Sequence, residues 1–172
     1  MESTRRGRTM EDRFWSKVDL NGPLPERRPE LGRCWQWTAA VSSSGYGNFL
    51  RSKGVYVNPH RLSWEMARGP VPPGMQLDHL CHNRLCVNPA HMRAVTNKQN
   101  HENLSGPQRN NTSGVRGVHW AKSRRKWVAR VQHDQRWYCV GSFATLAEAE
   151  DAVIAKRREL FTHNDLDRVV LS

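Results

Sequence analysis

Hydrophobic positions fall into two patterned stretches, residues 11–104 and 111–161, separated by a polar segment. In the first stretch their spacing predicts a helix over Glu11–Val18, a proline-rich loop over Asn21–Gly32 and a hairpin of Gly45–Arg51 with Val55–Val57. A second helix is predicted over Pro59–Arg68. Strands are then predicted over Met75–Leu80 and Met92–Val95, and a helix after Thr96. Asn58 before Pro59 is typical of a helix start, and Thr96 with Gln99 forms a capping box. The last three elements therefore have the order strand, strand, helix.

The second stretch predicts three strands and one long helix. The strands take up Val115–Trp120, Lys126–Gln132 and Arg136–Ser142, and the helix takes up Leu146–Leu160. This helix begins with a capping box of Thr145 and Glu148 and has an apolar stripe formed by Leu146, Ala149, Val153 and Leu160. Such a stripe can cover one face of a three-stranded sheet. The sequence thus predicts an α+β protein with a basic arm (1–10, including Arg5, Arg6 and Arg8), a first domain (11–104), a linker (105–110), a second domain (111–161) and a tail (162–172).

The amino-acid composition indicates which class of molecule the protein binds. The 172 residues carry 27 Lys or Arg against 16 Asp or Glu, a formal net charge of +11. This excess favours nucleic acid, because basic side chains that neutralise phosphates release condensed counterions. Seven Trp and four Phe exclude a purely disordered basic tail. No apolar run approaches the roughly 18 residues of a membrane span, so a soluble, intracellular protein with no membrane partner is expected.

Three residues with metal-ligand spacing lie in the turn between the two short strands. Cys81, Cys86 and His91 can supply three of the four ligands of a tetrahedral zinc ion. Cys34 and Cys139 remain for the fourth position, and Cys34 is preferred because flanking tryptophans anchor it in the same domain. The alternatives are a Cys81–Cys86 disulfide, which a cytosolic chain disfavours, or reduced thiols in a core.

Polar residues near this turn suggest hydrolytic chemistry. Asp78 and His79 end the first short strand, and Asn100 lies in the first turn of the following helix. Together they offer a carboxylate, an imidazole and an amide oxygen. Phosphodiester hydrolysis needs a base that deprotonates water and a hard cation that neutralises the developing charge. The alternative for an isolated Asp–His pair is a hydrogen-bonded surface pair.

The segment Leu77–Met92 resembles the ββα-metal nuclease motif of HNH homing endonucleases, in the zinc-bearing variant shared with the His-Cys box enzymes. Four upstream segments are similar to phage-borne HNH proteins: Phe14–Val18, Cys34–Trp37, Ser44–Gly47 and His60–Leu62. The resemblance covers about residues 11–104.

This resemblance implies a role for each matching residue. His79 matches the general base, and Asp78 and Asn100 match ligands of a catalytic Mg²⁺ or Mn²⁺ ion. The structural zinc ligands are implied to be Cys34, Cys81, Cys86 and His91. His91 stands where many HNH proteins have a middle Asn, and Arg61 matches an arginine on the scissile phosphate, although a general phosphate contact is the alternative.

The second stretch resembles the AP2 DNA-binding domain, which lays a three-stranded sheet in the major groove. Three segments carry the resemblance: Asn111–Val118, Trp127–Val131 and Gly141–Phe143. Between Arg109 and Arg136 there are eight Lys or Arg and one acid. Because strand residues alternate between faces, Trp127, Ala129 and Val131 should face the helix, whereas Val128, Arg130 and Gln132 should face DNA. The family match adds Arg116 and Trp137 to the DNA face, with Arg124, Arg125 and Lys126 as flanking phosphate contacts.

A solvated basic sheet is the alternative to this DNA surface. The sequence also departs from the AP2 pattern, since the loop His133–Gln135 is short and Arg130 replaces an acid common in plant members. Base preference therefore does not transfer.

These observations favour a metal-dependent DNA endonuclease of the homing type, with double-stranded DNA as partner and a monomer as the favoured state. A non-catalytic, zinc-stabilised, sequence-specific DNA-binding protein is the competing class, and RNA binding is a third option. The endonuclease is distinguished from the binding protein by the joint presence of Asp78, His79 and Asn100, since a binding protein needs none of them. The expected location is the cytoplasm, which for a phage-borne protein is that of the infected host.

Overall fold

The structure of the protein is a computed structural model that describes residues 8–104 and 106–168. Its contacts define two compact units that divide between Thr96 and Asn97. The linker predicted at 105–110 lies one helix further along the chain. Most of the predicted basic arm, with Arg5 and Arg6, and the end of the predicted tail lie outside the described residues. No helix within the described ranges is long and apolar enough to cross a membrane.

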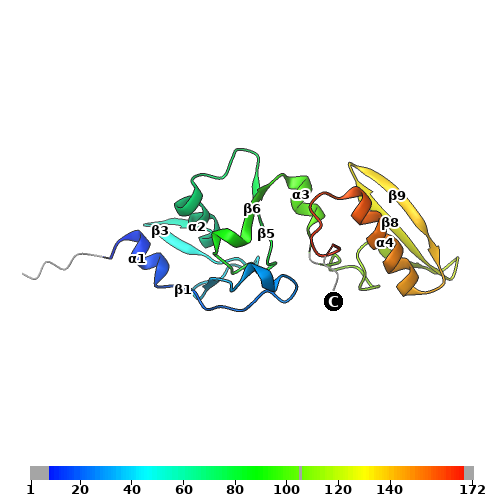
Figure 1. The fold of residues 1–172 in the computed structure, drawn as a ribbon, viewed down its shortest axis with the longest axis horizontal. Coiled ribbons are helices and arrows are strands. Elements are labelled where there is room, and N and C mark those ends of the chain that lie inside the picture. The colour runs from blue at the N-terminus through cyan, green and yellow to red at the C-terminus, as the bar shows by residue number, and fades with distance from the viewer. Residues whose placement is uncertain (1–7, 105, 169–172) are drawn as a thin grey trace, which may run out of the picture. The chain divides into compact units, whose positions relative to one another are not determined.

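The first unit consists of short elements (Figure 1). In chain order these are α1 (Met10–Trp15), β1 (Val18–Asp19), the 3-10 helix η1 (Pro29–Leu31), β2 (Gln36–Trp37), β3 (Phe49–Ser52), β4 (Val55–Val57), α2 (Pro59–Arg68), β5 (Gln76–His79), the 3-10 helix η2 (Pro89–His91) and β6 (Met92–Val95). The strands form three antiparallel pairs, β1 with β2, β3 with β4 and β5 with β6.

The helix predicted over Glu11–Val18 is shorter than expected. It begins after a Thr9–Asp12 capping box and ends at Trp15, with Ser16 as its C-cap. Val18 instead pairs with Trp37 across β1 and β2. Val18 therefore belongs to a strand pair, although the helical spacing of the hydrophobic residues predicted that the helix would extend to this position.

An aromatic core holds the first unit together. Phe14, Trp37 and Phe49 are buried with Leu62 and Val87. The Phe14 and Phe49 rings meet edge to face, with centroids 5.4 Å apart. Offset and edge-to-face aromatic pairs stabilise a core beyond the area they bury. This core packs α1, β2, the β3–β4 hairpin and α2 together.

The predicted order of strand, turn, strand and helix is confirmed. β5 and β6 are antiparallel, with His79 opposite Met92 and Asp78 opposite Arg93. Residues 80–91 form the turn between them, and the short helix α3 (Asn97–Glu102) follows β6. Antiparallel pairing therefore fixes the end of β5, where the predicted base lies.

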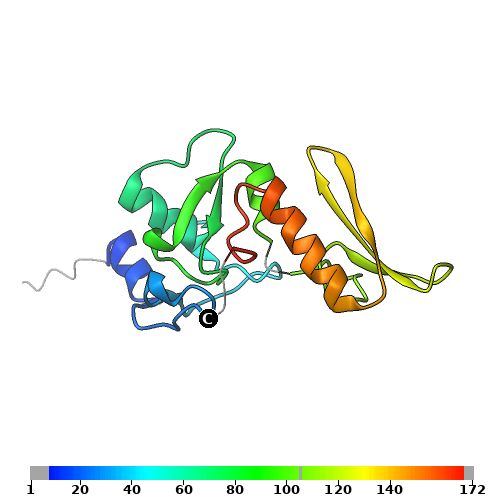
Figure 2. The same ribbon diagram turned by 45° about the vertical axis from the view of Figure 1, so that its right-hand side comes forward.

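The second unit contains α3, β7 (Val118–Ala121), β8 (Lys126–His133), β9 (Arg136–Phe143) and α4 (Leu146–Leu160). The three strands form one antiparallel sheet in the order β7-β8-β9. The predicted Thr145–Glu148 capping box begins α4. Ala149 and Val153 of this helix pack on Val118, Ala129 and Val131 of the sheet, so α4 covers one face (Figure 2).

Gly117 is a position where this sheet requires glycine. Its φ is +86°, and an added Cβ would lie 2.6 Å from the Arg130 carbonyl oxygen. Gly114 also has a positive φ, +76°, but its Cβ would have open space. A side chain at positive φ costs of order 1 to 3 kcal/mol, and a clash with backbone adds to this.

We therefore expect Gly117→Ala to lower the free energy of unfolding of the second unit by more than Gly114→Ala does. Urea unfolding followed by tryptophan fluorescence measures the difference. Equal losses of unfolding free energy in the two variants would mean that the close approach of Gly117 to the Arg130 carbonyl does not affect stability.

Candidate metal centre and active site

Four side chains from separate segments meet in the first unit. The ligand atoms of Cys34, Cys81, Cys86 and His91 all lie within 4.8 Å of one another. The His91 Nδ1 atom is 3.5 Å from Cys86 Sγ and 3.7 Å from Cys34 Sγ. Zn–S bonds of about 2.3 Å and Zn–N bonds of about 2.0 Å in a tetrahedron imply a distance of about 3.5 Å between the sulfur and nitrogen ligand atoms. The cluster can therefore hold a structural zinc ion.

The orientation of His91 suits this role. Its Nε2 atom lies 2.8 Å from the Leu31 carbonyl oxygen, which can only accept a hydrogen bond. The proton therefore sits on Nε2, and the lone pair of Nδ1 points toward the thiols. A histidine that binds a metal through one ring nitrogen usually donates a hydrogen bond of this kind from the other ring nitrogen.

The thiols of the cluster influence one another's ionisation. Hydrogen bonds from Cys81 and Cys86 lower the pKa of Cys34, whereas the interaction with Cys34 raises the pKa values of Cys81 and Cys86. All four cysteines of the chain are free, which sets aside the disulfide alternative. Cys139 is exposed and lies in β9, outside the cluster.

Asp78 lies at the end of β5 and is buried, with 6% of its surface exposed. Its carboxylate accepts hydrogen bonds from Arg93, and the Nε and Nη2 atoms of the guanidinium each lie 3.0 Å from Oδ2. Sequence analysis did not single out Arg93. The β5–β6 register, which the sequence alone does not give, places Arg93 directly opposite Asp78.

His79 is also buried, and a main-chain group orients its ring. The Nε2 atom donates to the Cys86 carbonyl oxygen at 3.0 Å, because a carbonyl cannot donate. Nδ1 consequently carries the lone pair. The pKa of His79 is lowered, chiefly because burial penalises the charged imidazolium, although the Cys86 hydrogen bond acts in the opposite direction.

Two rings that sequence analysis missed lie against His79. The centroid of His60 is 5.1 Å from that of His79, and the centroid of Tyr46 is 6.3 Å from it. Burial, followed by the charges of His79 and Arg61, lowers the pKa of His60 to about 3. Its buried Nδ1 atom has no hydrogen-bond partner among the described residues. His60 thus adds a polar atom that a bound group could contact.

Two other predicted site residues lie on helices. Arg61, in the first turn of α2, is half exposed and pairs with Glu65 at 3.1 Å. Asn100 lies in α3, which belongs to the second unit.

A basic hollow of about 410 Å³ is also present on the first unit, lined by residues that include Arg8, Arg13 and Lys17. None of the predicted catalytic residues lines it.

Of the strand residues predicted to face DNA, Arg130 and Gln132 are exposed and Val128 is half-buried. Ala129 and Val131 of β8 are buried, as alternation predicts. The Arg130 guanidinium lies over the Trp137 ring, 4.4 Å from its centroid. Arg124, Arg125 and Lys126 are exposed at the turn from β7 to β8.

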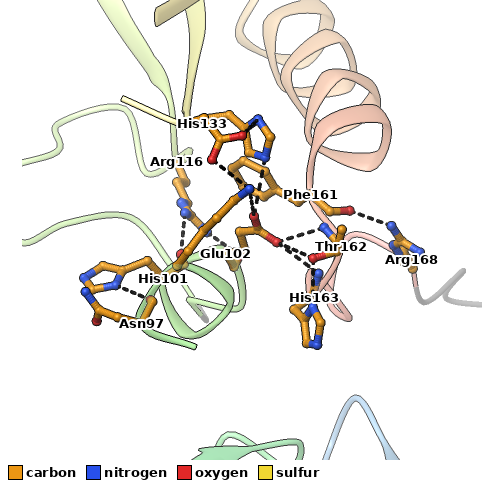
Figure 3. A network of polar contacts seen from close by, with 11 residues as sticks. Asn97, His101, Glu102, Arg116, His133, Phe161, Thr162, His163 and Arg168 are labelled. Carbon is orange, nitrogen blue, oxygen red and sulfur yellow. Dashed lines mark hydrogen bonds and ion pairs between the residues drawn. The ribbon is translucent and has the colours of Figure 1, made fainter. Parts of the chain in front are cut away.

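Arg116, which the family match also assigns to this face, makes contacts inside the second unit (Figure 3). Its guanidinium donates to the carbonyl oxygens of His101 and Glu102 at 2.8 and 2.9 Å. It also lies over the Phe161 ring, 5.4 Å from the centroid. Burial lowers the pKa of this guanidinium. The carbonyls at the end of α3 and the Phe161 ring therefore hold the Arg116 guanidinium.

Comparison with known proteins defines the class. The model of the HNH endonuclease family matches residues 58–102, a span that includes Asp78, His79, His91 and Asn100. Protein 7.7 of Escherichia phage T7 is 41% identical over 71 residues, covering 41% of this chain and 54% of that protein. Protein 3.8 of the same phage is 34% identical over 101 residues, covering 59% of this chain and 82% of that protein. No solved structure matches the chain significantly.

The matched span, the β5–β6–α3 order and the Cys/His cluster together define a protein with an HNH endonuclease domain. The chain belongs to the family of phage proteins that includes Protein 3.8 of phage T7. Its match spans about half the length of Protein 7.7.

Proposed function

We propose that the protein is a metal-dependent DNA endonuclease of the homing type, in which the HNH domain hydrolyses a phosphodiester and the second unit binds double-stranded DNA. One observation carries this proposal. The buried imidazole of His79 is oriented by the Cys86 carbonyl, follows the buried Asp78 carboxylate, and lies within the span that matches HNH endonucleases.

His79 is proposed as the general base. With the proton on Nε2 held by Cys86, the Nδ1 lone pair can take a proton from water. The water oxygen forms a bond to phosphorus while the bond from phosphorus to the leaving oxygen breaks, and that oxygen then takes up a proton from solvent. The Cys86 carbonyl keeps the ring in the tautomer that this step needs.

Asp78 and Asn100 are proposed as ligands of the catalytic cation. Carboxylate and amide oxygens suit a hard cation such as Mg²⁺ or Mn²⁺. When bound, such a cation neutralises charge on the phosphate and stabilises the leaving oxygen. Arg93 supports the Asp78 carboxylate in its buried position, since a buried charge needs a partner. Arg61, exposed on α2, is proposed to contact the scissile phosphate.

The zinc site is proposed to be structural. Its four ligands join the segment around Cys34 to the turn of residues 80–91 that follows His79. The same turn contains Cys86, whose carbonyl orients the base. Zinc bound by Cys34, Cys81, Cys86 and His91 would therefore support the catalytic geometry without touching the substrate.

The second unit is proposed to bind DNA in the manner of an AP2 domain. Its exposed sheet face presents Arg130, Gln132 and Trp137, with Arg124, Arg125 and Lys126 at the adjoining turn. Arginine and glutamine can read base edges in the major groove, whereas the basic turn suits phosphates. Stacking on Trp137 restricts the Arg130 guanidinium and favours a defined contact.

Arg130→Ala is expected to weaken binding to cognate DNA by about 1 to 3 kcal/mol and to change binding to scrambled DNA less. Arg124→Ala serves as the matched control, because loss of a phosphate contact should weaken both duplexes equally. Competition binding at two salt concentrations measures both. Equal losses on the two duplexes with Arg130→Ala would reduce this residue to a phosphate contact.

A plasmid assay tests the proposed activity. Purified, zinc-loaded protein should convert supercoiled plasmid to nicked or linear DNA with Mg²⁺ or Mn²⁺, and a chelator that removes these cations but leaves zinc in place should stop the reaction. Plasmid that stays intact across several divalent cations, although the protein binds it, would favour the non-catalytic DNA-binding protein.

A further inference from the structure

The basic hollow of about 410 Å³ lies wholly within the first unit, because every residue that lines it belongs to that unit. Three basic side chains line it: Arg8 before α1, Arg13 within α1 and Lys17 after it. The lining residues that the structure describes include no carboxylate, so the charge at the hollow is positive. The hollow therefore suits an anionic ligand.

Hydrogen bonds to the main chain hold two of these basic residues in place. The Arg13 guanidinium donates to the Leu50 and Arg51 carbonyl oxygens at 3.0 and 2.7 Å. Because carbonyl oxygens carry no formal charge, these bonds orient the guanidinium without neutralising it. The Lys17 carbonyl oxygen accepts hydrogen bonds from the Thr38 N–H and hydroxyl, each at 2.9 Å. The positive charges are therefore attached to a well-ordered wall.

Apolar side chains form much of the remaining lining. Tyr56 of β4 and Leu50 of β3 are cross-strand partners, so their side chains lie on the same face of the hairpin. Tyr56 is 62% exposed and Leu50 is 40% exposed, and Ala39 and Ala40 line the hollow with them. Unpaired nucleobases stack on exposed aromatic rings of this kind while basic side chains hold their phosphates. A site for inorganic phosphate alone needs no such apolar wall.

The distribution of the basic residues favours a nucleic-acid strand over a single nucleotide. Arg8 and Lys17 lie at the two ends of α1, so positive charge extends along the whole helix. The phosphates of a strand follow one another along its backbone and can meet charges that are spread in this way. Duplex DNA suits the hollow less well, because its bases are stacked on one another and present no free face to Tyr56.

We propose that this hollow binds an unpaired nucleotide of single-stranded DNA, with the base stacked on Tyr56 and the phosphates of the strand at Arg8, Arg13 and Lys17. The inference rests on the proposed function for the choice of DNA, since the strand ends that cleavage produces can unpair. It gives the nuclease domain a binding site of its own, apart from the sheet of the second unit.

The test measures how zinc-loaded, full-length protein binds a fluorescein-labelled oligothymidylate of about 12 nucleotides, within the usual site sizes for single strands. Fluorescence anisotropy is recorded without added Mg²⁺ or Mn²⁺, so that cleavage does not contribute. Tyr56→Ala should raise the dissociation constant by about 5- to 150-fold, the effect of losing one stacked base. Tyr56→Phe keeps the ring and should bind within about twofold of wild type. Val55→Ala should do the same, because Val55 is exposed on the same strand but does not line the hollow.

The salt dependence of binding tests the basic part of the hollow. Lys17→Gln should reduce the slope of log affinity against log salt by about 0.7, the contribution of one phosphate contact on a single strand. Lys53→Gln makes the same chemical change in the turn between β3 and β4, outside the lining, and should leave the slope unchanged.

A dissociation constant for Tyr56→Ala within about twofold of wild type overturns the inference, and so does an unchanged slope with Lys17→Gln. If thymidine monophosphate displaces the strand at a concentration near the strand's own dissociation constant, the hollow binds free nucleotides and the inference is wrong. Tighter binding of oligouridylate that is lost in Tyr56→Ala overturns the choice of DNA. The proposed function fails separately: a protein that binds the strand through Tyr56 but leaves plasmid intact supports this site and contradicts the endonuclease.

Discussion

His79→Ala is expected to lower the rate of single-turnover DNA cleavage by about 10²- to 10⁴-fold, the usual contribution of a general base. The buried imidazole is the group whose Nδ1 atom is left to accept a proton once Cys86 holds Nε2. Zinc content and DNA binding should be unchanged, because His79 is not part of the Cys/His cluster or of the exposed sheet. Cleavage at saturating protein, with either Mg²⁺ or Mn²⁺, measures the effect.

His163→Ala is the matched control for this loss. Its side chain contacts the Thr162 hydroxyl, and the main-chain N–H that donates to Glu102 is kept in the variant. Its rate should equal that of wild type. A rate for His79→Ala within a few-fold of wild type would exclude the base assignment.

Cys34→Ser should have the largest effect on stability. Removing one of four ligands leaves Cys81, Cys86 and His91 without the ligand that joins the Cys34 segment to the turn. Because zinc binding and folding are coupled in small metal domains, at about 10 to 16 kcal/mol of apparent binding free energy for zinc-finger peptides, the first unit should lose most of its zinc and its cooperative melting.

Elemental analysis after dialysis against a mild chelator, with calorimetric melting, measures both quantities. Wild type should retain one zinc per chain. Cys139→Ser makes the same chemical change at an exposed position of β9 and should retain zinc and melting temperature. Full zinc occupancy with unchanged melting in Cys34→Ser would assign the fourth ligand to another residue.

Features with a local signal were predictable from the sequence. The Thr145–Glu148 capping box and the alternation through Ala129 and Val131 depend on neighbouring residues, and the structure has both. The gathering of Cys34 with the three ligands in the turn was also predictable, since flanking tryptophans place it in the core of the same unit.

Features set by long-range pairing were not predictable in this way. The ion pair of Asp78 with Arg93 depends on the β5–β6 register, and the packing of His60 on His79 depends on how α2 docks. The hydrogen bonds from Arg116 to the carbonyls at the end of α3 also join segments that are apart in the sequence. No pattern near Arg116 indicates such a partner.

Cleavage mapping on a genomic DNA library, with the ends sequenced, tests the central proposal most directly. Wild-type protein with Mg²⁺ or Mn²⁺ should give ends that recur at one extended sequence, and the same ends should be absent with His79→Ala and with chelator. Recurrent ends produced equally by His79→Ala, or no ends above background at sites where the protein binds, would contradict the account of a homing-type HNH endonuclease.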